Sequence, residues 1–78
     1  MGRKKPAQSR AREAFIAEVR RRMAARGITQ EELGTRLGVT QPAISRLLSG
    51  TYNPSLDLME SVARALDCEL QVALAPRT

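Results

Sequence analysis

Apolar residues recur every three or four positions between residues 9 and 26: Phe15, Ile16, Val19 and Met23. This spacing places them on one face of a helix. Ser9 is of a type that caps helix N-termini, and Gly27 suits the left-handed position just past a last turn. The pattern predicts one amphipathic helix that ends at Arg26, with the arginines at 20–22 on its solvent-facing side.

A capping-box pattern opens a second, shorter helix at Thr29. In Thr29-Gln30-Glu31-Glu32, the threonine side chain accepts the amide of Glu32 while the Glu32 carboxylate reaches back. Two inward-facing leucines follow before Gly38 ends the helix. The sequence therefore predicts a helix over residues 29–37, which is too short to be stable alone.

A third helix of similar length follows after a tight turn. Thr40 caps it, and Pro42 lies in its first turn, where a missing N–H costs nothing. Gly50 closes the helix, and its buried side consists of Ile44, Leu47 and Leu48. Because this helix is also short, the pair depends on flanking helices for packing.

The rest of the chain predicts a fourth helix and then a change of period. Ser55 caps a helix whose apolar stripe ends at Leu66. Over residues 69–75 the spacing becomes that of a strand, because Leu70, Val72 and Leu74 alternate with polar or small residues. A lone strand needs a partner for its ladder groups, and the same strand of a second subunit would supply one. The alternative is a frayed helical turn whose leucines cover the core.

These elements predict an all-α fold with one added strand, divided into three segments. Residues 1–8 lack apolar periodicity and are interpreted as a disordered basic arm. Residues 9–67 form the helical domain, and residues 68–78 form a strand-like tail suited to dimerisation. A chain of 78 residues is enough for one small domain.

Positive charge is concentrated in the first third of the chain. Residues 1–26 contain nine basic and two acidic residues, whereas residues 27–78 contain four basic and six acidic ones. One interpretation is a solubilising tail and a solvated helix face. The other interpretation is an arm and a helix that contact phosphates, and the pair of short helices that follows in the sequence favours it. The basic residues of this arm are Arg3, Lys4, Lys5, Arg10 and Arg12.

Several classes of protein are excluded by composition. The chain has one cysteine, Cys68, and no histidine, so it forms neither an internal disulfide nor a cysteine metal cage. It has no catalytic histidine, cysteine cluster or phosphate-binding glycine loop, so we expect no enzyme activity, no metal and no cofactor. The sequence has no long apolar run, so it predicts neither a membrane span nor a secretory signal. A cytoplasmic location agrees with this composition.

The outward side of the third helix carries residues suited to reading DNA. An α-helix fits the major groove, where Gln pairs with adenine, Arg pairs with guanine, and small side chains contact the thymine methyl group. The residues left outside the predicted core are Gln41, Ala43, Ser45 and Arg46. Alternatively, Gln41 is only an exposed first-turn residue, and Arg46 contacts a phosphate or a surface acid.

Contacts that fix the register on DNA are expected from residues around this helix. Thr29 and Gln30 open a helix whose N-terminal amides can meet a phosphate. Thr40 combines capping with a phosphate contact. Further candidates for contacts to the same DNA strand follow the third helix: Thr51, Tyr52 and Asn53. Tyr52 has an alternative role in packing against the loop.

The motifs of the helix pair and its surroundings together resemble a known family. They are Thr29-Gln30-Glu31-Glu32-Leu33, Leu37-Gly38-Val39-Thr40-Gln41, Ala43-Ile44-Ser45-Arg46, Gly50, Asn53-Pro54-Ser55-Leu56 and Ala63-Arg64-Ala65-Leu66. Over about residues 13–67 the chain resembles the Cro and phage-repressor type of helix-turn-helix protein, also called the xenobiotic-response-element family. The resemblance implies a compact, lambda-repressor-like bundle of four or five helices that binds an operator as a symmetric dimer. It also implies that Gln41 reads bases and Gln30 anchors a phosphate.

Two departures from the family pattern carry predictions. Gly34 stands where the family usually has Ala, which costs the helix up to about 1 kcal/mol and suggests closer packing of the two helices. An Arg and Glu that often form an ion pair are replaced by Met23 and Leu48. Because replacing both partners together can be neutral or stabilising, we expect Met23 and Leu48 to touch.

The resulting hypothesis is a transcriptional repressor that binds double-stranded DNA as a homodimer through a palindromic operator. The C-terminal tail, together with the loop that runs from Ser49-Gly50 to Asn53-Pro54-Ser55-Leu56, also resembles a subset of the family that includes HigA-type antitoxins. The alternative hypothesis is therefore an antitoxin that binds a toxin protein and regulates its own operon.

Overall fold

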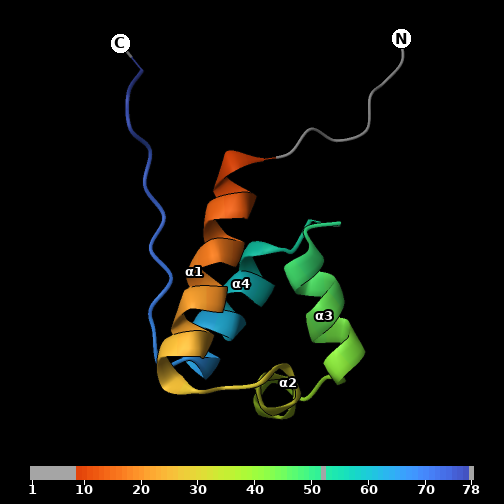
Figure 1. Ribbon diagram of the computed structural model, residues 1–78. Coiled ribbons are helices and arrows are strands. Elements are labelled where there is room, and N and C mark those ends of the chain that lie inside the picture. Colours follow the sequence, from red (N-terminus) through yellow and green to blue (C-terminus); the bar gives the residue numbers. More distant parts are fainter. Residues whose placement is uncertain (1–8, 52, 78) are drawn as a thin grey trace, which may run out of the picture.

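The computed structural model describes residues 9–51 and 53–77, and in them it places four helices (Figure 1). These are α1 (Arg10–Arg26), α2 (Gln30–Leu37), α3 (Gln41–Ser49) and α4 (Leu56–Ala65). Their order and bounds agree closely with the sequence prediction. The predictions for residues 1–8, which include Arg3, Lys4 and Lys5, and for Tyr52 and Thr78 lie outside the described residues.

Each helix begins after a residue whose side-chain oxygen accepts a backbone N–H. Ser9 accepts from Arg12 at 3.1 Å, Thr29 from Glu32 at 3.0 Å, Thr40 from Ala43 at 3.3 Å and Ser55 from Leu58 at 3.0 Å. Caps of this kind typically stabilise a helix by about 1 kcal/mol each. Only half of the predicted capping box forms, because the Glu32 carboxylate lies 3.6 Å from the Arg36 guanidinium rather than at the Thr29 amide.

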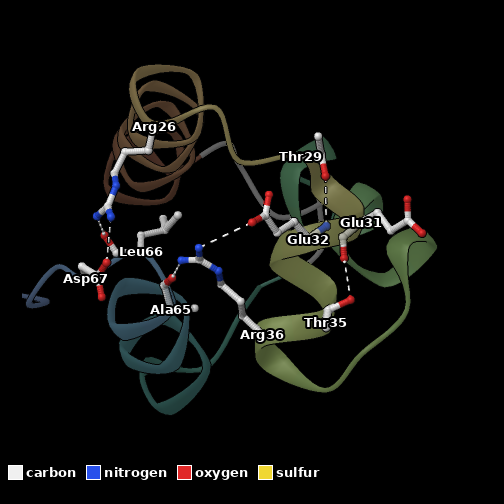
Figure 2. A network of polar contacts seen from close by, with 9 residues as sticks. All are labelled: Arg26, Thr29, Glu31, Glu32, Thr35, Arg36, Ala65, Leu66 and Asp67. Atoms are coloured by element: carbon white, nitrogen blue, oxygen red, sulfur yellow. Dashed lines mark hydrogen bonds and ion pairs between the residues drawn. The ribbon is translucent and has the colours of Figure 1, made fainter.

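Two arginines from other helices hold the C-terminal end of α4 (Figure 2). Arg26 donates to the Leu66 carbonyl at 3.2 Å and lies 2.9 Å from the Asp67 carboxylate. Arg36 donates to the Ala65 carbonyl at 2.7 Å. Cations are favourable at this end of a helix because its last carbonyls are unsatisfied. The ends of α1 and α2 are thereby tied to the end of α4.

One hydrophobic core joins all four helices. Its most deeply buried side chains are Leu33, Ile44, Val62 and Leu66, and α1 adds Ile16, Val19 and Met23. The short helix α2 packs against both α3 and α4. Met23 and Leu48 are both buried in this core and not on different surfaces, as expected of an apolar pair in place of an ion pair.

The turn between α2 and α3 lies directly on Gly34. A β-carbon added to Gly34 would be 2.7 Å from the Val39 carbonyl oxygen and 3.3 Å from the Thr40 carbonyl carbon. The Val39 N–H also donates to the Gly34 carbonyl at 2.8 Å. The close packing predicted for this glycine is therefore present, and it is a contact with the backbone of the turn.

The prediction of a strand over residues 69–75 is wrong for the single chain. After Asp67, a non-glycine residue with φ of 59°, the chain is extended along α1 but is assigned no strand within the described residues (Figure 1). The physical reason is that an extended segment becomes a strand only with a hydrogen-bonded neighbour, and the tail has none within this chain. The alternative of a helical turn is not present either.

In the described parts of the chain, none of the helices combines the length and apolar character needed to cross a membrane.

We predict that Gly34→Ala lowers the free energy of unfolding by about 1 kcal/mol, because the added carbon displaces backbone in the turn. In the absence of the contact with the turn, alanine would stabilise the helix by about 1 kcal/mol relative to glycine. The sign of the change in the free energy of unfolding therefore tells whether the contact or the helix propensity dominates. Urea unfolding measures it, and Thr35→Ala is the control because Thr35 is the exposed helical neighbour. A stabilised Gly34→Ala protein would contradict the close contact.

Candidate nucleic-acid interface

The exposed side of α3 contains the residues predicted to read bases. Gln41, Ser45 and Arg46 are exposed, whereas Ala43 is half-buried. The other side of the helix, with Ile44, Leu47 and Leu48, is in the core. We call Gln41, Ala43, Ser45 and Arg46 the reading face. Pro42 and Ser49 are also exposed on this helix; the sequence analysis placed Pro42 only in the first turn and did not single out Ser49.

A hydrogen bond joins the first residues of α2 and α3. The Gln41 side-chain nitrogen donates to the Gln30 side-chain oxygen at 2.7 Å. A glutamine amide has two N–H donors and one oxygen acceptor, so Gln41 keeps one donor and its acceptor. This is the pair of groups that bidentate recognition of adenine needs. The amide nitrogen of Gln30 also stays available for a phosphate oxygen.

Arg46 lies on the same exposed side, one turn after Gln41 and Pro42. Within the residues that the structure describes, its guanidinium takes part in no ion pair or hydrogen bond. The alternative in which it pairs with a surface acid is therefore not seen among these residues, and the exposed guanidinium is accessible to a guanine or a phosphate.

The other end of α3 brings together residues predicted to contact phosphates. The Ser49 hydroxyl donates to the Arg46 carbonyl at 2.7 Å and lies 2.9 Å from the Thr51 hydroxyl. Arg12, in the first turn of α1, donates to the side-chain oxygen of Asn53. The beginning of α1 and the loop after α3 thus meet (Figure 1), so Arg12 is placed beside the end of the reading helix. Thr29 and Thr40 lie exposed at the opposite end of α3.

Arg20 holds the C-terminal end of α3, which the sequence analysis missed. Its guanidinium donates to the Leu48 carbonyl at 3.0 Å. The run at residues 20–22 is therefore not a uniform solvent-facing surface, because Arg20 serves a fold contact. The sequence contained a signal for this contact. Arg20 lies three residues before Met23, on nearly the same side of the helix, and Met23 was expected to touch Leu48.

The positive charge of the first third is divided between fold contacts and surface. Arg21 pairs with Glu18, Arg26 with Asp67, and Arg20 with a carbonyl. Arg10 and Arg22 are exposed, and Arg12 lies at the loop after α3. Two parts of α1 therefore meet the end of α3: Arg20 contacts its last turn, and Arg12 contacts the loop that follows it. In the described residues, no group of three or more potential metal ligands is present.

Comparison with known proteins places the chain in a family. The model of the helix-turn-helix family matches residues 19–72, which include all of α2, α3 and α4. The chain belongs to the helix-turn-helix family. It is thus a DNA-binding type of domain and not an enzyme, and the resemblance to Cro and phage repressors is confirmed at this level.

The curated relatives are themselves regulators whose functions are not described. An uncharacterized HTH-type transcriptional regulator of Methanothermobacter thermautotrophicus is 54% identical over 43 residues, which are 55% of this chain and 62% of the relative. The uncharacterized HTH-type transcriptional regulator y4dL of Sinorhizobium fredii is 40% identical over 65 residues, or 83% of this chain and 32% of the relative. The chain matches between about a third and just under two thirds of the lengths of such relatives. No solved structure matches it with comparable significance.

We predict that Arg20→Met lowers the free energy of unfolding by about 1 kcal/mol, because the Leu48 carbonyl loses its charged donor. Arg21→Met is the matched control. It removes the same charge from an exposed pair and should change stability by less than about 0.5 kcal/mol. Chemical denaturation of both variants measures the difference. Equal effects would show that the Arg20 contact does not stabilise α3.

Proposed function

We propose that the protein is a sequence-specific transcriptional regulator, a repressor that binds a palindromic operator as a homodimer. In this proposal α3 lies in the major groove with its reading face against the base edges. The observation that supports it most is the Gln30–Gln41 hydrogen bond, because it orients an exposed glutamine while leaving its donor and acceptor pair for adenine. Arg46 would read guanine or contact a phosphate.

The proposed phosphate contacts lie at both ends of α3. Gln30, Thr29 and Thr40 would hold the strand at the beginning of the helix, where backbone N–H groups also point outward. Thr51, Tyr52 and Asn53, with Arg12, would hold it at the end. The basic arm would follow the backbone or enter the minor groove, as short basic arms do.

A homodimer would give the operator its symmetry. We propose that the C-terminal tail forms the interface through Leu70, Val72 and Leu74. Two copies of α3 would then contact half-sites about 34 Å apart, one helical turn of DNA.

Gln41→Ala should cost about 1–3 kcal/mol of discrimination at one base pair in each half-site, because the adenine contact is lost. Affinities for a bound duplex and its single-base variants measure this. Gln71→Ala is the control, since Gln71 is exposed on the tail, across α1 from α3 (Figure 1). Equal weakening on the operator and on random DNA would contradict base reading by Gln41.

Deletion of residues 1–8 should weaken binding to all duplexes alike. The segment carries three basic residues, so the slope of log affinity against log salt concentration should fall by at most about three. Titrations at several salt concentrations measure the slope. Arg64→Gln, which removes a charge paired with Glu60 on α4, should leave the slope unchanged. An unchanged slope in the deletion variant would show that the arm makes no phosphate contacts.

A further inference from the structure

An apolar groove of about 560 Å³ lies between α1, α4 and the C-terminal tail. Phe15 lines it from α1, Leu56 and Met59 line it from α4, and residues 68–73 form its third side. Its rim carries both signs of charge, including Arg22 on α1 and Glu69 on the tail.

Exposed apolar side chains gather at this groove. The large apolar residues that are exposed in the described chain are Val39, Leu56, Val72 and Leu74. Leu56 and Val72 line the groove with 59% and 70% of their surface exposed, and Leu74 follows at 97%. Exposed apolar side chains that line a groove with a polar rim are candidates for an interaction site.

The backbone of the tail is also unpartnered. The last backbone hydrogen bond at its start runs from the Cys68 N–H to the Ala63 carbonyl at 2.8 Å. Beyond Cys68, up to residue 77, no backbone hydrogen bond to another described residue is present. The tail is extended along its length, so both edges offer donors and acceptors to a second extended segment.

We propose that this second segment is the tail of another copy of the chain, paired antiparallel with its two-fold axis at Val72. The inference rests on the dimer of the proposed function and specifies its register and contacts. In an antiparallel pair, residues directly opposite point to the same face. A register centred on a residue therefore keeps Leu70, Val72 and Leu74 of both tails on one face. A register centred between residues would set apolar residues against polar ones.

Among these registers, the one centred on Val72 pairs the largest apolar side chains. It places the partner's Leu74 opposite Leu70, which is half-buried beside the groove, and the two Val72 residues opposite each other. The six residues then form one apolar face that covers Phe15, Leu56 and Met59.

A second copy fits this site better than an unrelated protein because the surface is self-complementary. A two-fold interface uses the same patch on both subunits. Here one tail offers both an apolar face and one side of the groove that receives it, and its backbone offers unpaired donors and acceptors. In the described part of the chain no other extended segment is available as a partner for the tail.

Cysteine cross-linking tests the register in a Cys68→Ser background. Val72→Cys should form a disulfide-linked dimer under mild oxidation, because residues opposite each other are within disulfide reach. Leu74→Cys is the matched control. Its two copies would lie four residues apart along the strands, about 13 Å, and should not cross-link. Faster cross-linking of Leu74→Cys than of Val72→Cys would overturn the register.

Sedimentation of the full chain tests the interface itself. The wild type should be a dimer, Val72→Asp should be a monomer because two carboxylates would face each other, and Gln71→Asp should stay dimeric with the same added charge on the other face. Since Val72 is mostly exposed in the single chain, the helical circular dichroism of Val72→Asp should be unchanged. A monomeric wild type, or a dimeric Val72→Asp, would overturn the inference.

The failure of this inference is distinguishable from failure of the proposed function. A wild type that is monomeric yet loses base discrimination on Gln41→Ala would retain DNA reading without this interface. In such a monomer the apolar tail would be free to bind a different protein, as the antitoxin alternative requires. A dimer that binds no duplex selectively would keep the interface and contradict the regulator.

Discussion

The backbone of one turn rests on Gly34, and the orientation of the whole reading face follows from that contact. Two features hold α3 against α2: a Val39 N–H bond to the Gly34 carbonyl and the absence of a side chain where the turn passes. Neither helix is long enough to be stable alone, so their relative placement must come from such contacts and from the core beneath them. Gln30 and Gln41 then lie close enough to share a hydrogen bond. The position of the Gln41 side chain beside Gln30 is thus a consequence of how closely two short helices pack.

Charge in this protein serves the fold as well as its partner. The basic first third suggests a continuous DNA-binding surface, yet Arg20 and Arg26 donate to carbonyls at the ends of α3 and α4. Such contacts stabilise the unsatisfied ends of helices. They also fasten α1 to the ends of α3 and α4, so the net charge overstates the charge that is available for phosphates. Arg20 thus ties α3 to α1 at Leu48, whose side chain is buried in the same core as Met23.

The sequence predicted what is local and left out what depends on distant partners. The caps at Thr29 and Thr40 and the helix bounds follow from residue types at short spacing, and the close approach at Gly34 was predicted from a departure from the family pattern. The Gln30–Gln41 bond joins residues 11 positions apart, and the Arg20 contact spans 28, so both need the tertiary arrangement. The strand was predicted from the alternation of apolar and polar residues in the tail, but a strand also needs a second strand to hydrogen-bond with. The single chain supplies none, and the extended tail is what remains.

The central claim is that α3 reads a defined DNA sequence in two symmetric half-sites. Selection of bound duplexes from a random pool tests it most directly, because it reports specificity, symmetry and spacing at once. We predict enrichment of an inverted repeat whose half-sites are centred about one helical turn apart, with an adenine at the position facing Gln41. A pool that stays random after repeated selection, although the protein binds DNA, would contradict the account.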